Sequence, residues 1–151
     1  MLIANIDPLK YLQAVPYSYL RYSNIKQIDI PDNILRINDY AFENCKNLQY
    51  VKNLKNMISI GEEAFCGCSS LEYINLPTSI ENVGYYAFDG CKKLKYIDYE
   101  GTKLQWVNNV NSINMSTSIL YIKCTDGFIR QHYVYEDEKP KQFQFFVDDP
   151  F

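Results

Sequence analysis

Hydrophobic and polar positions recur along the middle of this chain in three consecutive blocks of 23 residues, 35–57, 58–80 and 81–103. In every block an aliphatic residue, an Ala-Phe pair, a cysteine and a leucine hold the same places. These positions are Ile37, Ile60 and Val83; Ala41, Ala64 and Ala87; Phe42, Phe65 and Phe88; Cys45, Cys68 and Cys91; and Leu48, Leu71 and Leu94. A fixed period of this length indicates a solenoid, because one unit alone cannot bury its apolar face and must stack on its neighbours.

Each block contains one segment typical of a short strand, NLQYVKN, SLEYINL or KLKYIDY. Side chains alternate across a strand, so one set of positions faces the interior and another faces solvent. The inward set is Leu48, Val51, Leu71, Ile74, Leu94 and Ile97, and the outward set is Tyr50, Lys52, Tyr73, Asn75, Tyr96 and Asp98. Proline cannot donate to a strand ladder, so Pro31 and Pro77 predict turns directly after two of the strands.

A second buried ridge is expected after each turn, beginning at Ile37, Ile60 and Val83. Gly61 and Gly84 follow it and predict a tight bend. Asn38 holds the same place in the first block, and asparagine tolerates the left-handed conformation that such a bend uses. The Ala-Phe pair then inserts an aromatic ring into the centre of the coil.

The two ends depart from the repeat. Residues 1–14 are expected to form an N-terminal cap with a short helix beginning near Asp7-Pro8, and the repeats are expected to span 15–106. The first repeat, 15–34, is degenerate, with a strand over 24–30, Gln27 and Asp29 facing out, and Tyr19 or Leu20 as its central ring. Residues 107–151 are expected to form a C-terminal β cap with an acidic and aromatic tail: a hairpin around Asp126-Gly127 and a third strand over 142–147. This meander either seals the open end of the solenoid or extends as an arm that docks on another subunit by strand addition.

The string IP-x-x-(I/V)-x-x-I-(G/N)-x-x-A-F-x-x-C-x-x-L-x-x-(I/V) resembles the BspA-like leucine-rich repeat, whose units are about 23 residues long. The resemblance implies an α/β, β-rich, right-handed solenoid with a short parallel sheet, and a protein-interaction or adhesive role without catalysis. Many surface members of the family carry an export signal and an anchor. This sequence shows neither a signal peptide nor a transmembrane segment, so we expect a cytoplasmic or virion-associated protein without membrane insertion.

Composition narrows the candidate chemistry. The net charge of -3 argues against a nucleic-acid partner, because phosphate backbones require a basic surface. Three of the five cysteines share one repeat position, which indicates a column of buried thiols. A metal site built from Cys66, Cys68 and a neighbour is the alternative, although Cys-x-Cys supplies only two of the four ligands that zinc prefers. The single histidine, His132, lacks partners for nucleophilic catalysis, so we expect no enzyme activity and no cofactor.

The outward positions of the predicted strands are the best candidate binding surface. Tyrosine is enriched at binding surfaces, although it also favours strands for reasons of packing alone. The candidate partner-binding residues are Gln27, Asp29, Tyr50, Lys52, Tyr73, Asn75, Tyr96 and Asp98. The first hypothesis is a non-enzymatic protein-binding module, such as a phage or bacterial accessory factor or inhibitor. The alternatives are a structural virion or surface-assembly subunit that oligomerises through its edges and C-terminal segment, and a carbohydrate-binding adhesin.

Overall fold

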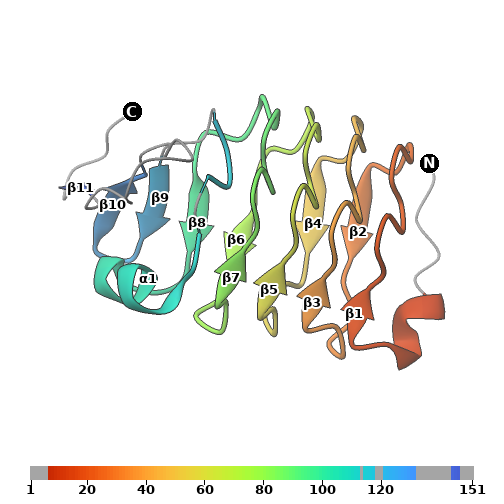
Figure 1. Ribbon diagram of the computed structural model, residues 1–151, viewed down its shortest axis with the longest axis horizontal. Helices are drawn as coiled ribbons and strands as arrows, with labels where there is room; N and C mark the ends of the chain where they lie inside the picture. Colours follow the sequence, from red (N-terminus) through yellow and green to blue (C-terminus); the bar gives the residue numbers. More distant parts are fainter. Residues whose placement is uncertain (1–6, 113, 118–120, 132–143, 147–151) are drawn as a thin grey trace.

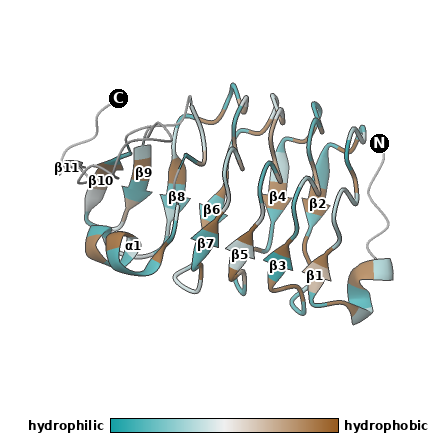
Figure 2. Cartoon of the chain, viewed as in Figure 1, coloured by the Kyte–Doolittle hydropathy of each residue, from teal (hydrophilic) through white to brown (hydrophobic). Residues whose placement is uncertain are grey.

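A computed structural model of the chain shows coils stacked side by side along one long axis, with the N-terminal helix at one end and a small meander at the other (Figure 1). It describes residues 7–112, 114–117, 121–131 and 144–146. Hydrophobic and hydrophilic residues alternate along every coil instead of gathering in one stretch of chain (Figure 2). The predicted β-rich solenoid is confirmed.

Each coil contributes strands to two parallel ladders. The first ladder is a four-stranded sheet in the order β1 (Ala14–Val15), β3 (Arg36–Ile37), β5 (Ser59–Ile60) and β7 (Asn82–Val83). The second ladder contains β2 (Gln27–Asp29), β4 (Tyr50–Lys52), β6 (Asn75–Leu76) and β8 (Ile97–Tyr99). Here β2 pairs with β4 and β6 with β8, and a Tyr50–Tyr73 bridge joins the two pairs. The second ladder was predicted, whereas the first was expected only as a buried ridge.

The apolar positions shared by the blocks form one continuous core. The side chains of Phe42, Phe65 and Phe88 are fully buried, and their rings stack with centroids 5.1 and 5.6 Å apart. Backbone hydrogen bonds hold successive coils together at this level, from Phe42 N to the Ala64 carbonyl and from Phe65 N to the Ala87 carbonyl, both 2.8 Å. The predicted inward residues are all buried: Leu48, Val51, Leu71, Ile74, Leu94 and Ile97.

The predicted column of buried thiols is confirmed. Cys45, Cys68 and Cys91 are buried, and each Sγ donates to the carbonyl of a residue one coil earlier. The acceptors are the carbonyls of Leu20, Phe42 and Phe65, at 3.0, 3.1 and 3.2 Å. The thiols therefore satisfy their donors inside the core, as buried polar groups must.

The expected left-handed bend at Gly61, Gly84 and Asn38 is wrong, because none of these three residues has a positive φ. Glycine is needed there for a different reason. A Cβ built on Gly84 would lie 2.5 Å from the backbone nitrogen of Glu62 in the preceding coil. Two other positions of the repeat are left-handed in every block: Tyr40, Glu63 and Tyr86, with φ of 58°, 50° and 53°, and Asn44, Gly67 and Gly90, with φ of 56°, 73° and 72°.

The N-terminal end is closed by a 3-10 helix, η1 (Asp7–Tyr11), which begins at the residue where a short helix was expected. Its Leu9 is fully buried against the core. Leu20 N donates to the Ala41 carbonyl at 2.7 Å, in the same pattern that Phe42 makes with the next coil. Leu20 thus occupies the central ring position of the degenerate first repeat, and both Leu20 and Tyr19 are partly buried against the core.

The C-terminal end begins with a helix that was not expected from the sequence, α1 (Lys103–Asn109). Thr102 and Gln105 form its capping box, in which each side chain accepts a hydrogen bond from the backbone nitrogen of the other. The predicted hairpin follows, with β9 (Tyr121–Cys124) and β10 (Gly127–Arg130). The third strand is β11 (Gln144–Phe146), and residues 132–143 and 147–151 of the predicted cap lie outside the described residues. Because β9 pairs in parallel with β8, the meander continues the second ladder and covers its edge.

Candidate functional site

The second ladder brings the eight predicted partner-binding residues onto one face, which we refer to as the tyrosine face. Strand register places them in two rows. The registers are Gln27–Tyr50, Asp29–Lys52, Tyr50–Tyr73 and Asn75–Asp98. The first row is Gln27, Tyr50, Tyr73 and Tyr96, and the second row is Asp29, Lys52, Asn75 and Asp98.

The three tyrosines of this face are not equally accessible. The side chains of Tyr50 and Tyr73 are 41% and 48% exposed, whereas Tyr96 is half-buried. Two groups from the C-terminal meander cover Tyr96. The Phe128 ring packs edge-on against it at a centroid distance of 5.9 Å, and Lys123 Nζ lies 5.4 Å from its ring centre. Tyr50 and Tyr73 are therefore the main aromatic surface offered to a partner.

Both rows continue onto β9, a strand expected only as part of the C-terminal cap. Lys123 is paired with Asp98 and so extends the second row. Because Ile122 is paired with Ile97, Tyr121 comes in register with Tyr96 and extends the first row. The signal was present in the sequence, since Tyr121-Ile122-Lys123 repeats the Tyr-aliphatic-Lys order of Tyr50-Val51-Lys52. The face is thus longer than predicted.

A hollow of about 410 Å³ opens on one side of Tyr73. Asn75 Nδ2 donates to Glu100 Oε1 at 2.9 Å on its rim. Asn53, also in the lining, donates from Nδ2 to Asp32 Oδ1 at 2.8 Å. This hydrogen bond and the ion pair with Lys55 keep the pKa of Asp32 below its usual value. The hollow is lined by Tyr50, Val51, Lys52, Asn53, Leu54, Lys55, Tyr73, Asn75 and Glu100.

A second hollow of about 500 Å³ also has Tyr73 in its lining and is more basic than the first hollow. Its lining contains three exposed lysines and one carboxylate, Glu72. Glu72 accepts from the Tyr50 hydroxyl at 3.4 Å and lies 3.9 Å from Lys93 Nζ. The lining residues are Glu72, Tyr73, Lys92, Lys93, Lys95 and Tyr96. The repeat pattern did not mark these lysines as a cluster, because only Lys92 has a lysine, Lys46, at its position in another block.

The local environment favours the uncharged form of the Tyr73 hydroxyl at the centre of the tyrosine face. Partial burial, with the neighbouring Asp98 carboxylate, raises the pKa of Tyr73 above its usual value. Burial also raises the pKa of Asp98, an effect that the nearby Lys123 ammonium opposes. The Tyr73 hydroxyl therefore stays protonated, with its proton directed to Asp98, and its oxygen can accept a hydrogen bond from a partner.

The described residues show no arrangement typical of a metal site, since no group of three or more His, Cys, Asp or Glu side chains is placed to hold an ion. Cys66 is half-buried, and burial raises its pKa to about 11, so its thiol stays protonated at neutral pH. His132 lies outside the described residues. No helix in the described part of the chain is long and apolar enough to cross a bilayer.

Comparison with solved structures finds a leucine rich cell surface protein from Faecalibacterium prausnitzii A2-165. The two are 16% identical in sequence and superpose with a TM-score of 0.39 over 79% of this chain. The match spans 46% of the other chain, so this protein corresponds to less than half of that one. No curated protein matches this chain in sequence.

The sequence profile of the BspA type leucine rich repeat region matches six copies over residues 13–130. The match covers most of the chain and extends beyond the three full blocks, through α1 and into the C-terminal hairpin. It agrees with the stacked coils, the file of phenylalanine rings and the column of cysteines described above. The chain belongs to the BspA type leucine-rich repeat family.

Proposed function

We propose that this chain is a non-enzymatic protein-binding module and that the tyrosine face holds the partner. The observation that carries the proposal is the position of Tyr73, which lines both hollows while 48% of its surface stays exposed. A large ring at the centre of a surface, with cavities on both sides, is where binding energy is usually concentrated. Solenoid repeats also present extended surfaces of this kind to protein partners.

The mixed charge of the face favours a protein over a uniform polyanion. Asp29 and Lys52 are neighbours in the second row, and Asp98 and Lys123 are neighbours at its other end. The lysines Lys92, Lys93 and Lys95 flank only one side of Tyr73. Such an arrangement gives a partner a defined orientation, because opposite charges must meet at several separate points.

The test is a binding measurement with a matched pair of tyrosine variants. Immobilised chain is used to isolate and identify a partner from the native source, and its affinity is then measured by calorimetry. We expect Tyr73→Ala to weaken binding by roughly tenfold to a hundredfold, as truncation of a central aromatic residue does. The control is Tyr85→Ala, because Tyr85 is 50% exposed and lies in the turn after β7, beside the first ladder. Equal affinity of the Tyr73→Ala variant and the unaltered chain would remove the tyrosine face as the binding surface.

A further inference from the structure

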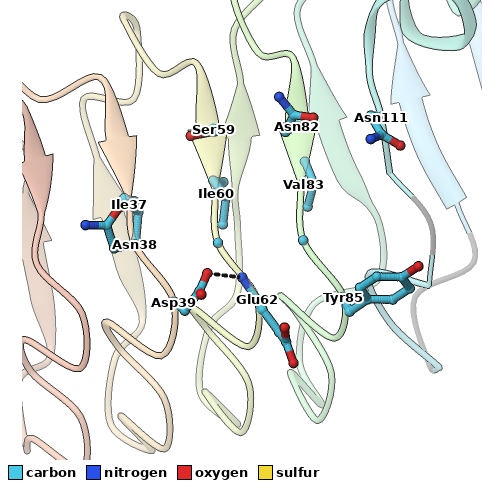
Figure 3. A pocket seen from close by; sticks show the side chains of 12 residues that line it. Ile37, Asn38, Asp39, Ser59, Ile60, Glu62, Asn82, Val83, Tyr85 and Asn111 are labelled. Atoms are coloured by element: carbon cyan, nitrogen blue, oxygen red, sulfur yellow. Dashed lines mark hydrogen bonds between the residues drawn. The ribbon is translucent and has the colours of Figure 1, made fainter.

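The first ladder carries a separate groove of about 510 Å³ over β3, β5 and β7 (Figure 3). Two polar rows border it. One row is Ser59, Asn82 and Asn111, and the other is Asp39, Glu62 and Tyr85 (Figure 3). Between the rows, Gly61 and Gly84 carry no side chain, whereas Asn38 stands at the same repeat position in the preceding coil. None of these residues lines either hollow of the tyrosine face.

The first row offers hydrogen-bonding groups that the chain itself does not use. Within the described residues, the side chains of Ser59, Asn82 and Asn111 make no hydrogen bond. Each asparagine amide provides two donors and an acceptor, and the serine hydroxyl provides one donor and two acceptor lone pairs. The row therefore suits a ligand that is rich in groups able both to donate and to accept.

The second row is held in place by the fold. Asp39 Oδ1 accepts from the backbone nitrogen of Glu62 at 2.8 Å, and Glu62 Oε1 lies 3.5 Å from the Tyr40 hydroxyl. Each carboxylate retains an oxygen that can accept from a ligand hydroxyl. Tyr85 closes the row with an aromatic ring that is 50% exposed, a flat apolar surface with a polar tip.

The spacing of the rows fits a repeating ligand. Ser59 and Asn82 are register partners, and Asn82 bridges to Asn111, so equivalent side chains recur once per coil. Neighbouring strands are about 4.8 Å apart, which is comparable to the length of one sugar residue in an extended chain. A linear oligosaccharide lying along the solenoid axis would thus meet one amide or hydroxyl and one second-row group at each ring.

The charge of the groove identifies the class of oligosaccharide. Its lining contains two carboxylates and no lysine, arginine or histidine, so phosphate and acidic sugars are repelled. Arg36 is the register partner of Ser59 but does not line the groove. A protein partner is disfavoured because Ile37, Ile60 and Val83 are buried, which leaves Tyr85 as the one large anchor among the lining residues. We infer that this groove binds a neutral, linear oligosaccharide.

The test is saturation-transfer difference NMR of the full chain with four neutral hexasaccharides: β-1,4-linked glucose, α-1,4-linked glucose, β-1,3-linked glucose and β-1,4-linked N-acetylglucosamine. We expect transfer to at least one of them and weaker binding of its disaccharide. Tyr85→Ala and Asn82→Ala should each lower by about tenfold the affinity for the hexasaccharide that binds, as loss of a central contact does. Because Tyr85 and Asn82 are exposed, both variants should keep the thermal midpoint of the unaltered chain.

The control is Tyr73→Ala, which alters the tyrosine face and should leave oligosaccharide binding unchanged. An oligolysine peptide is run in parallel, because the two carboxylates could instead attract a cationic segment. Binding of oligolysine alone, absence of transfer to all four sugars, or sugar binding that survives both groove variants would each overturn the inference. Loss of sugar binding in Tyr73→Ala but not in Tyr85→Ala would also overturn it, and would place the sugar on the tyrosine face.

Discussion

The ring of Phe65 stacks on the ring of Phe42, with centroids 5.1 Å apart and planes 7° from parallel. The two residues are 23 positions apart in sequence, and their alignment comes from the backbone hydrogen bonds that join one coil to the next. Phe88 extends the file on the other side of Phe65 at 5.6 Å. Each ring therefore contributes to the packing of its own coil and of its neighbours.

Phe65→Ala should strongly destabilise the fold, because the removed ring leaves a cavity between two others. We expect the free energy of unfolding to fall by about 3–5 kcal/mol, measured by urea titration. Tyr73→Ala is the matched control, an aromatic truncation at an exposed position, and should change stability by less than about 0.5 kcal/mol. A loss below about 1 kcal/mol in the Phe65 variant would contradict a rigid file of rings.

Gly84→Ala and Gly90→Ala separate two reasons for glycine in the repeat. At Gly84 the new Cβ would meet backbone of the preceding coil at 2.5 Å, and backbone cannot move aside, so we expect a loss of about 3 kcal/mol. At Gly90 the nearest atoms are at 3.4 Å, and the change meets only the strain of φ +72°, about 1 kcal/mol. Urea unfolding of both variants measures the difference. A larger loss at Gly90 would show that backbone strain, not coil contact, selects glycine.

The buried thiols predict that the protein loses stability at alkaline pH. Burial raises the pKa of Cys45 from 9.0 to about 11 and also raises the pKa of Cys68 and Cys91. Between pH 9 and 11 the unfolded chain loses protons that the folded chain keeps, so the free energy of unfolding falls as the pH rises. Each such thiol contributes about 1.4 kcal/mol per pH unit to this slope.

The thiol contribution is isolated by replacing one member of the column. Cys68→Ala should make the decline shallower by about 1.4 kcal/mol per pH unit, measured by urea unfolding at several pH values from 8 to 11. Ser69→Ala, a neighbouring change that removes no thiol, should retain the original slope. Identical slopes for the Cys68 variant and the unaltered chain would show that this thiol ionises equally well in the folded state.

Much of the architecture was readable from the repeat, and the omissions have physical reasons. Two-residue strands such as β3 and β5 are too short to show alternation, so the first ladder was visible only as apolar positions. The seven residues of α1 show too little helical periodicity to stand out, although the capping box at Thr102 and Gln105 marks its start. The role of Gly84 depends on the distance to Glu62 in another coil, which no local pattern encodes.

The sequence by itself determined which side chains enter the core and which form the rows of the tyrosine face. A repeat of constant length makes every coil equivalent, so a position buried in one coil is buried in the next. Only the tertiary structure decided how accessible those rows are and where a second polar groove lies. Phe128 covers Tyr96 because β9 continues the second ladder, and Ser59, Asn82 and Asn111 align because of register between coils. These features arise from contacts between residues distant in sequence.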